Sequence, residues 1–271
     1  MRGVKAAYGS VVVLEDIDLT VSAGEVVALT GVNGVGKSTL LSCLAGFLSP
    51  VEGTVNVLGG PPRDNAAFWR AVAVVADQPT WYPGLTAREL LELVRMTHRP
   101  LTGWCLPPDD LIEIFGLTAR ADASPLSLSS GQRQRLSLAA ALARPSRLLL
   151  LDEPEQSLDA DFRQELAVLL GEEYVSNGGT VVMATHDHEF AVAAGARIML
   201  LSDGRAVEPD DFEADDGEYA EYDDDADVPS TEYDEGRDAT LSTEYDDARG
   251  EDPDDDLAGS PEAPDPARQD R

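Results

Sequence analysis

A glycine-rich loop between a buried strand and a helix constrains this chain more than any other feature. The run before it, 25–30, is almost continuously apolar, as expected of a strand buried on both faces, and residues 38–48 have the apolar content of a helix. Glycines stand at positions 31, 34 and 36 of the connecting loop, and Lys37 follows them. Glycine backbones let successive N–H groups turn toward one anion, and the helix N-terminus adds a positive dipole. The loop therefore predicts a phosphate-binding site.

The loop matches the pattern G-x-x-x-x-G-K-[ST] in full, which favours a nucleoside triphosphate as the ligand. Lys37 is one of two lysines in a chain with 18 arginines, so this compact ammonium suggests a point-charge contact with the β- and γ-phosphates. Ser38 is expected to ligate Mg²⁺. A purely structural turn is the alternative, but it does not account for the strand before the loop and the helix after it. The loop residues predicted to bind ATP are Gly31, Asn33, Gly34, Gly36, Lys37, Ser38 and Thr39.

A second apolar strand, 148–151, ends in Asp152 and Glu153. Two carboxylates at the end of a buried strand are costly, and a bound Mg²⁺ would offset that cost. Asp152 is predicted to hold the metal through water, and Glu153 to orient and polarise the attacking water. The alternative is a strand that simply ends in an acidic turn. The glycine loop upstream argues against it.

A serine–glycine turn at 128–132 precedes this strand and opens a helical pattern that runs to Ala143. The glycine loop, this turn and the acidic strand end, in this order, resemble the ATP-binding cassette (ABC) ATPases, and the turn resembles that family's signature motif. The family usually has glycine where this chain has Ser130. The resemblance implies that the turn contacts, in trans, the γ-phosphate of an ATP bound by a second subunit. The signature residues are Leu128, Ser129, Ser130, Gly131 and Gln132.

The resemblance covers residues 3–207 and implies two further catalytic positions beside Glu153. Gln78 resembles the glutamine that senses and ligates Mg²⁺ and links to the helical lobe. His186, at a predicted strand end, resembles the switch histidine that contacts the γ-phosphate. The Mg²⁺ ligands implied are therefore Ser38, Gln78 and Asp152.

The resemblance also assigns an adenine contact and a subunit contact. Tyr8 resembles the aromatic residue that stacks on adenine, with ordinary packing as the alternative. A segment called the D-loop is expected after the acidic strand end, although Glu155 and Gln156 replace the usual small residues before it. The D-loop residues are Ser157, Leu158 and Asp159.

Strands and helices alternate along residues 1–208, which predicts one domain of the α/β class. The expected fold is a P-loop NTPase with a RecA-like, mostly parallel sheet, an antiparallel β subdomain and an inserted helical lobe at about 80–143. The β-rich runs 11–14 and 17–21 precede the glycine loop, and a capping box, Thr86 with Glu89, opens the first helix of the lobe.

Residues 209–271 differ sharply in composition from the body of the chain. From position 208 onward there are 27 acidic and 4 basic residues, so this part holds 23 of the 31 net negative charges. Such an acidic, aliphatic-poor tail is predicted to be disordered. A solvated extension is the simplest interpretation. The repeated Ser-Thr-Glu-Tyr-Asp element leaves open a tail that binds a basic partner or regulates assembly.

The family resemblance implies the motor subunit of a membrane transporter, with ATP and Mg²⁺ as its cofactors. The sequence has no apolar run of about 18 residues, so a separate integral membrane permease is expected as a partner. Without an N-terminal signal or a disulfide framework, the chain is predicted to be cytoplasmic and to lie on the inner face of the plasma membrane through the permease.

The segment 82–89 and the lack of an extra domain after 207 favour an exporter, with an importer ATPase as one alternative. The other alternative is an ABC ATPase that acts on ribosomes or DNA without a permease. The negative charge argues against nucleic acid as a partner. The second partner expected is another ATPase subunit. A homodimer is feasible because this chain has the residues for both halves of each site.

Overall fold

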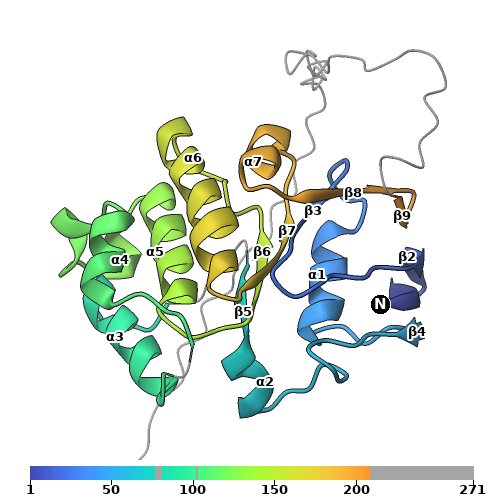
Figure 1. The fold of residues 1–271 in the computed structure, drawn as a ribbon, viewed down its shortest axis with the longest axis horizontal. Coiled ribbons are helices and arrows are strands. Elements are labelled where there is room, and N and C mark those ends of the chain that lie inside the picture. The colour runs from blue at the N-terminus through green and yellow to red at the C-terminus, as the bar shows by residue number, and fades with distance from the viewer. Residues whose placement is uncertain (77–80, 102, 208–271) are drawn as a thin grey trace, which may run out of the picture. The chain divides into compact units, whose positions relative to one another are not determined.

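The computed structural model describes residues 1–76, 81–101 and 103–207 and contains a six-stranded sheet flanked by helices (Figure 1). Neighbouring strands pair in parallel across this sheet, and the edge strand β9 pairs antiparallel with β8. The predicted α/β class with a mostly parallel sheet is confirmed. In spatial order the strands are β5 (Val72–Val75), β6 (Leu148–Asp152), β7 (Thr180–Ala184), β3 (Val26–Thr30), β8 (Arg197–Ser202) and β9 (Arg205–Val207).

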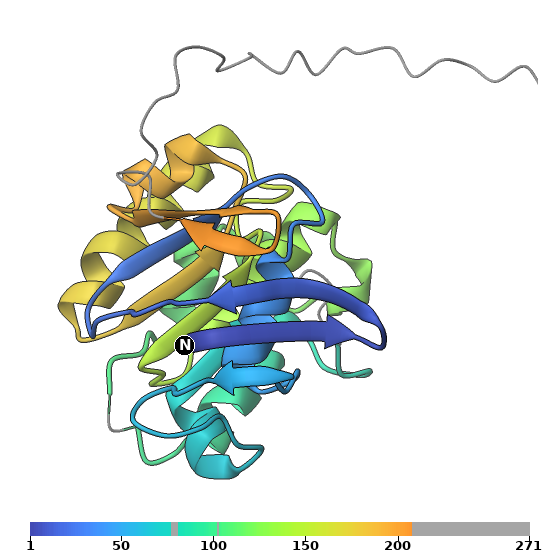
Figure 2. The same cartoon turned by 90° about the vertical axis from the view of Figure 1, so that its right-hand side faces the viewer.

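A separate three-stranded antiparallel sheet forms the predicted β subdomain (Figure 2). Its central strand is β1 (Arg2–Tyr8), which lies between β2 (Val11–Ile17) and β4 (Glu52–Thr54). The prediction of a strand at 17–21 was wrong, because β2 ends at Ile17. The backbone N–H of Leu19 instead donates to the carbonyl of Met1 at 3.2 Å, so tertiary pairing at the chain start overrides the local β preference.

The helix after the glycine loop, α1 (Lys37–Ala45), is shorter than the stretch 38–48 that the apolar pattern favours. Gly36 precedes it and Gly46 follows it, and both have left-handed backbones with φ of 114° and 78°. Glycine is the residue that adopts this conformation without a steric penalty, so the two glycines fix both ends of α1.

Among the residues that the structure describes, three helices lie between β5 and β6 in the sequence, where the helical lobe was expected. The first begins with the predicted capping box, since the Thr86 side chain accepts from the N–H of Glu89 and the Glu89 carboxylate accepts from the N–H of Thr86. The three are α3 (Ala87–Thr97), α4 (Pro108–Ile114) and α5 (Ser130–Leu142), with short 3₁₀ turns η1 (Thr118–Arg120) and η2 (Pro125–Ser127).

The remaining helices flank the strands of the large sheet. Helix α6 (Ala160–Val168) follows β6 in the sequence and continues as a π-helical segment, η3 (Leu169–Tyr174). The others are α2 (Ala66–Ala71) and α7 (His188–Ala193). Among the described residues, none of the helices combines the length and apolar content needed to cross a membrane. The domain boundary predicted at 208–209 and the acidic tail lie outside the described residues.

Both faces of the large sheet are buried, which explains why its strands read as continuous apolar runs. Alternate residues of a strand point to opposite faces. Leu151 therefore packs in one core with the helices of the lobe and with α6. Leu150 packs in a second core with α1 and the antiparallel sheet. The strand ends are consequently held rigidly on two sides, as a positioned site requires.

Candidate active site

The sequence motifs meet because the strands that carry them are neighbours. In the order β6-β7-β3, each strand is parallel to the next, so their carboxyl ends share one edge of the sheet (Figure 1). The glycine loop follows β3, Glu153 follows β6, and His186 follows β7. Ligand sites of parallel α/β sheets lie at this carboxyl edge.

The glycine loop curves around a pocket of about 160 Å³. Lys37 is only 6% exposed, and its ammonium donates to the carbonyl of Gly31 at 2.8 Å and to that of Val32 at 3.4 Å. A Cβ on Gly31 would lie 2.4 Å from the carbonyl oxygen of Leu201, so close packing requires glycine there. Gly31 does not line this pocket but a neighbouring one, which it shares with Asn33 and Gly34. The lining of the 160 Å³ pocket is Asn33, Gly34, Gly36, Lys37, Ser38, Thr39 and Glu153.

Two of the predicted Mg²⁺ ligands converge at the mouth of this loop. The hydroxyl of Ser38 donates to Oδ1 of Asp152 at 3.0 Å, which brings an oxygen from α1 next to one from β6. Hydroxyl and carboxylate oxygens are the donors that Mg²⁺ prefers, so the residues present fit this ion. The third predicted ligand, Gln78, lies outside the described residues.

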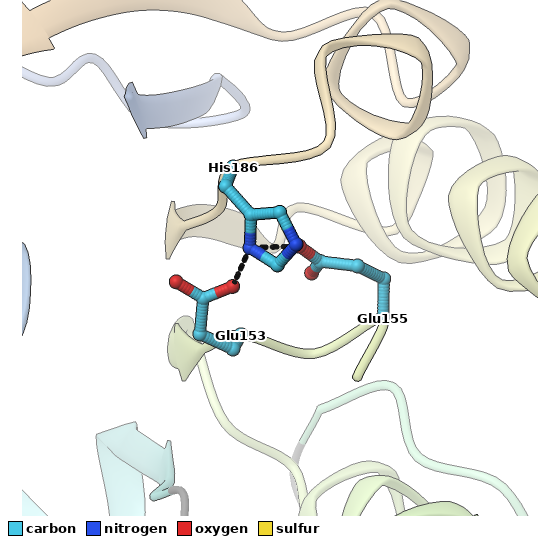
Figure 3. Close-up of side chains that lie close together, drawn as sticks. All are labelled: Glu153, Glu155 and His186. Atoms are coloured by element: carbon cyan, nitrogen blue, oxygen red, sulfur yellow. Dashed lines mark hydrogen bonds and ion pairs between the residues drawn. The ribbon is translucent and has the colours of Figure 1, made fainter. Parts of the chain in front are cut away.

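Glu153 is placed by an unusual backbone. Its φ is 46°, in the left-handed region that a non-glycine residue rarely adopts, and its N–H donates to the carbonyl of Ala184 at 2.9 Å. One carboxylate oxygen lies 3.9 Å from the ammonium of Lys37. The other accepts from Nδ1 of His186 at 2.5 Å (Figure 3). The structure thus brings together two of the three predicted catalytic residues.

His186 itself is 62% exposed at its side chain, but the residues on either side of it are anchored. Thr185 is fully buried, and Asp187 accepts from the N–H of Phe190 at 2.9 Å as the N-cap of α7. The imidazole therefore projects from a fixed turn toward the carboxylate of Glu153 (Figure 3).

Glu155 is a site residue that the sequence analysis missed. It is 4% exposed, its carboxylate accepts from the hydroxyl of Thr185, and it lies 3.8 Å from Nδ1 of His186 (Figure 3). Burial raises the pKa of its carboxyl above the usual range, and the nearby charge of Glu153 adds to the rise. The signal available in the sequence was a carboxylate two positions after Glu153, in a turn that must pack back onto the sheet.

The signature turn begins α5 with a second capping box. The Ser129 hydroxyl accepts from the N–H of Gln132 at 3.2 Å, and the Gln132 side chain accepts from the N–H of Ser129 at 3.1 Å. Leu128 is buried, whereas Ser129 and Ser130 are exposed. The predicted contact of this turn with a second subunit's ATP stays a prediction.

Gly131 connects the signature turn to the predicted D-loop. A Cβ on Gly131 would lie 2.5 Å from the carbonyl oxygen of Ser157, so glycine is needed for this close approach. Ser157 has a left-handed backbone, Leu158 is buried, and Asp159 caps α6 and binds Arg135 at 2.5 Å. The two motifs that were expected to contact a second subunit therefore lie side by side.

One turn further along α5, Gln134 joins this helix to the turn after β6. Its side-chain amide donates to the carbonyls of Glu153 and Pro154, both at 3.2 Å.

Tyr8, the predicted adenine contact, ends β1 with 54% of its surface exposed. Its ring is accessible for stacking, and its role stays a prediction.

Comparison with known proteins agrees with this geometry. Residues 14–156 match the family model described as ABC transporter. The aliphatic sulfonates import ATP-binding protein SsuB 3 of Pseudomonas savastanoi is 38% identical over 76% of this chain and 73% of its own length. The thiamine import ATP-binding protein ThiQ of Cereibacter sphaeroides is 38% identical over 71% of this chain and 84% of its own. The spermidine/putrescine import ATP-binding protein PotA of Chromobacterium violaceum is 36% identical over 78% and 58%.

Solved structures give the same result at the level of the fold. An ATP-binding subunit of an ABC transporter superposes with a TM-score of 0.69, at 28% identity over 78% of this chain and 89% of that one. A bacterial ABC transporter cassette solved as a dimer superposes with a TM-score of 0.65, at 27% identity over 76% and 94%. The family model, these relatives and these structures together show that the chain belongs to the ABC transporter family, as an ATP-hydrolysing subunit.

Proposed function

We propose that this chain is the ATP-hydrolysing motor of a membrane importer. The support for import comes from relatives that are named import ATP-binding proteins for sulfonates, polyamines and thiamine. They favour the importer alternative over the exporter predicted from segment 82–89. That segment leads into the capping box of α3, a local feature that carries no information on the direction of solute movement.

The phosphate-binding half of the site follows from the glycine loop. Lys37 exchanges its contacts with the loop carbonyls for the β- and γ-phosphates, while the loop N–H groups and the start of α1 bind the same charge. Ser38 and Asp152, with Gln78, would hold Mg²⁺. When bound, this ion neutralises phosphate charge and polarises the γ-phosphate.

The hydrolytic half rests on a single observation, the 2.5 Å contact between His186 and Glu153 beside the loop pocket. Glu153 orients the attacking water and accepts its proton. His186 holds the γ-phosphate and keeps the Glu153 carboxylate directed toward the water. Since the side chain of Glu153 also faces the ammonium of Lys37, base and phosphate ligand share one pocket.

The full assembly proposed is a dimer of ATPase subunits on a separate permease. The dimeric cassette among the solved structures supports the dimer, and the relatives' role as subunits of import systems supports the permease. In this arrangement Ser129 and the N–H of Gly131 contact the γ-phosphate bound by the partner. The chain is then peripheral to the membrane, held there by the permease.

The first experiment is capture from membranes of the source cells. The Glu153→Gln protein is loaded with ATP and Mg²⁺, and the chains bound to it are identified. Recovery of a multi-span membrane protein is expected. Recovery of ribosomes or DNA-repair proteins instead would overturn the transport function.

The direction of transport is tested separately in a strain that lacks the gene. Uptake and efflux of labelled sulfonates, polyamines and thiamine are compared with the parent strain. Loss of uptake of one class, restored by the wild-type gene but not by the Glu153→Gln gene, is expected. Loss of efflux with normal uptake would contradict import.

A further inference from the structure

Burying the carboxyl group of Glu155 costs free energy of folding, and that cost needs an explanation. It is 4% exposed in the turn between β6 and α6, and its Oε2 has no hydrogen-bond partner among the described residues. A buried polar atom without a partner destabilises a fold by about 1–3 kcal/mol. An apolar side chain of similar size would avoid that cost. A buried carboxyl here is therefore expected to hold another part of the site in place.

The contacts of Glu155 lead to the turn that carries His186. Its Oε1 accepts from the hydroxyl of Thr185, and the oxygen of that hydroxyl accepts from the N–H of Asp187 at 3.0 Å. These two residues flank His186 on both sides. Asp187 is itself fixed as the cap of α7 and by Arg163 at 2.9 Å. The chain of bonds thus runs from the turn after β6 to both neighbours of His186.

The same turn carries Glu153, two residues before Glu155. Oε1 of Glu155 also lies 3.8 Å from Nδ1 of His186, which is the atom that contacts Glu153 at 2.5 Å (Figure 3). Few other contacts define the imidazole, because its side chain is largely exposed. Its place relative to Glu153 must therefore come from the backbone of the turn.

We infer that Glu155 is a positioning residue, which ties the His186 turn to the Glu153 turn through Thr185 and so sets the contact between His186 and Glu153. This inference rests on the catalytic roles proposed for those two residues. Burial raises the pKa of the Glu155 carboxyl, so it keeps its proton to a higher pH than an exposed glutamate does. Glutamine is then its closest isostere, and it keeps an oxygen that can accept from Thr185.

The test compares four variants of the full chain in ATP hydrolysis. Glu155→Leu and Thr185→Val each remove one end of the bond, and the double variant removes both. We expect each single variant to lower kcat by about tenfold or more with the KM for ATP nearly unchanged, since misplaced groups cost rate rather than binding. The double variant should be no slower than the slower single variant, because both break one link. Glu155→Gln should retain most of the wild-type kcat.

A second readout reports the position of His186 without relying on turnover. The chain has three histidines, so the ring Cε1–H signal of His186 can be assigned in NMR spectra by its loss in His186→Ala. This signal should shift in Glu155→Leu and Thr185→Val but not in Glu155→Gln. Glu165→Leu, an exposed glutamate on α6, is the matched control and should change neither readout.

Several outcomes would overturn the inference. One is a folded Glu155→Leu protein with normal kcat and an unshifted His186 signal. Another is that Glu155→Leu and Thr185→Val lower the melting temperature but change neither kcat nor the His186 signal. If Glu155→Leu fails to fold, Thr185→Val and Glu155→Gln still decide the question. Should Glu153→Gln or His186→Ala keep normal turnover, the proposed function fails instead, and the NMR signal still reports whether Glu155 positions His186.

Discussion

At the scale of single residues, Glu153 illustrates how much of the site is set by backbone geometry. Its left-handed φ of 46° carries a strain on the order of 1–3 kcal/mol, which the surrounding structure must offset. The bond from its N–H to Ala184 and the two bonds that its carbonyl and that of Pro154 accept from Gln134 supply that support. The motif Asp152-Glu153 predicts the carboxylate, but the strained turn that aims it is visible only in the structure.

Replacing Glu153 by glutamine should separate binding from hydrolysis. The amide keeps the size of the side chain but cannot accept a proton, so we expect kcat to fall by about 10²-fold or more with ATP still bound. Equilibrium binding of labelled ATP and single-turnover hydrolysis measure the two effects. Lys37→Ala is the contrast, because it should weaken ATP binding itself. Normal hydrolysis by the Glu153→Gln protein would show that Glu153 is not the general base.

Gly131→Ala should disturb two predicted subunit contacts at once. Its Cβ would lie 2.5 Å from the backbone oxygen of Ser157, so either α5 or the D-loop must move, at a cost of roughly 1–3 kcal/mol in the free energy of unfolding. Urea unfolding measures the stability, and steady-state hydrolysis should fall as well. Gly60→Ala is the control, since a Cβ there meets nothing within 4 Å. Equal stability of the two variants would contradict the close approach.

At the scale of elements, features that depend on neighbours in sequence are predictable and those that depend on packing are not. Both capping boxes, Thr86 with Glu89 and Ser129 with Gln132, lie within one helical turn; the first was predicted from this local pattern. The π-helical segment after α6 contains Gly171, where a Cβ would lie 2.4 Å from the carbonyl oxygen of Ala194. No local pattern reports that contact, so it could not be predicted from the sequence.

The π-helical segment also carries a buried phenol that should make stability depend on alkaline pH. Burial raises the pKa of Tyr174 to about 12, and its hydroxyl donates to the carbonyl of Ser146 at 3.0 Å. An acid whose folded pKa is raised stabilises the fold fully below its unfolded pKa of about 10, and this contribution is lost as pH rises toward 12.

The expected loss between pH 10 and 12 is on the order of 2 kcal/mol in the wild type relative to Tyr174→Phe. Urea unfolding at a series of pH values measures it. Because Cys43 is present in both proteins, the difference between the two curves reports the phenol together with its charge interaction with Arg144. Parallel curves would show that Tyr174 titrates as it does in the unfolded chain.

At the scale of the whole molecule, the family and the hydrolytic reaction could be read from the sequence, whereas the direction of transport could not. The predicted site motifs are short, and each follows from the phosphate chemistry expected of Lys37, Ser38 and Asp152. In the proposed assembly the direction depends on a separate permease, and none of the helices in the described residues could span a membrane. The role of Glu155 was equally hidden, because its partner Thr185 is 30 residues away.

Truncation after residue 208 should leave the body of the protein unchanged. The removed part holds most of the net negative charge but none of the predicted site residues. We expect the same melting temperature and the same kcat, with weaker electrostatic attraction to basic surfaces. Calorimetry, hydrolysis assays and permease capture test this. A changed kcat or lost permease binding would instead assign the tail a regulatory role.

The helix α5 has a mechanical consequence for a pair of such subunits. Its first turn carries the signature residues and abuts Ser157, and its second turn is bonded through Gln134 to the backbone of Glu153. A displacement at the signature turn would therefore be passed directly to Glu153, the proposed base, in the same chain. Two subunits that each touch the other's ATP through this turn would sense each other's occupancy, so their hydrolysis cycles would be coupled in time.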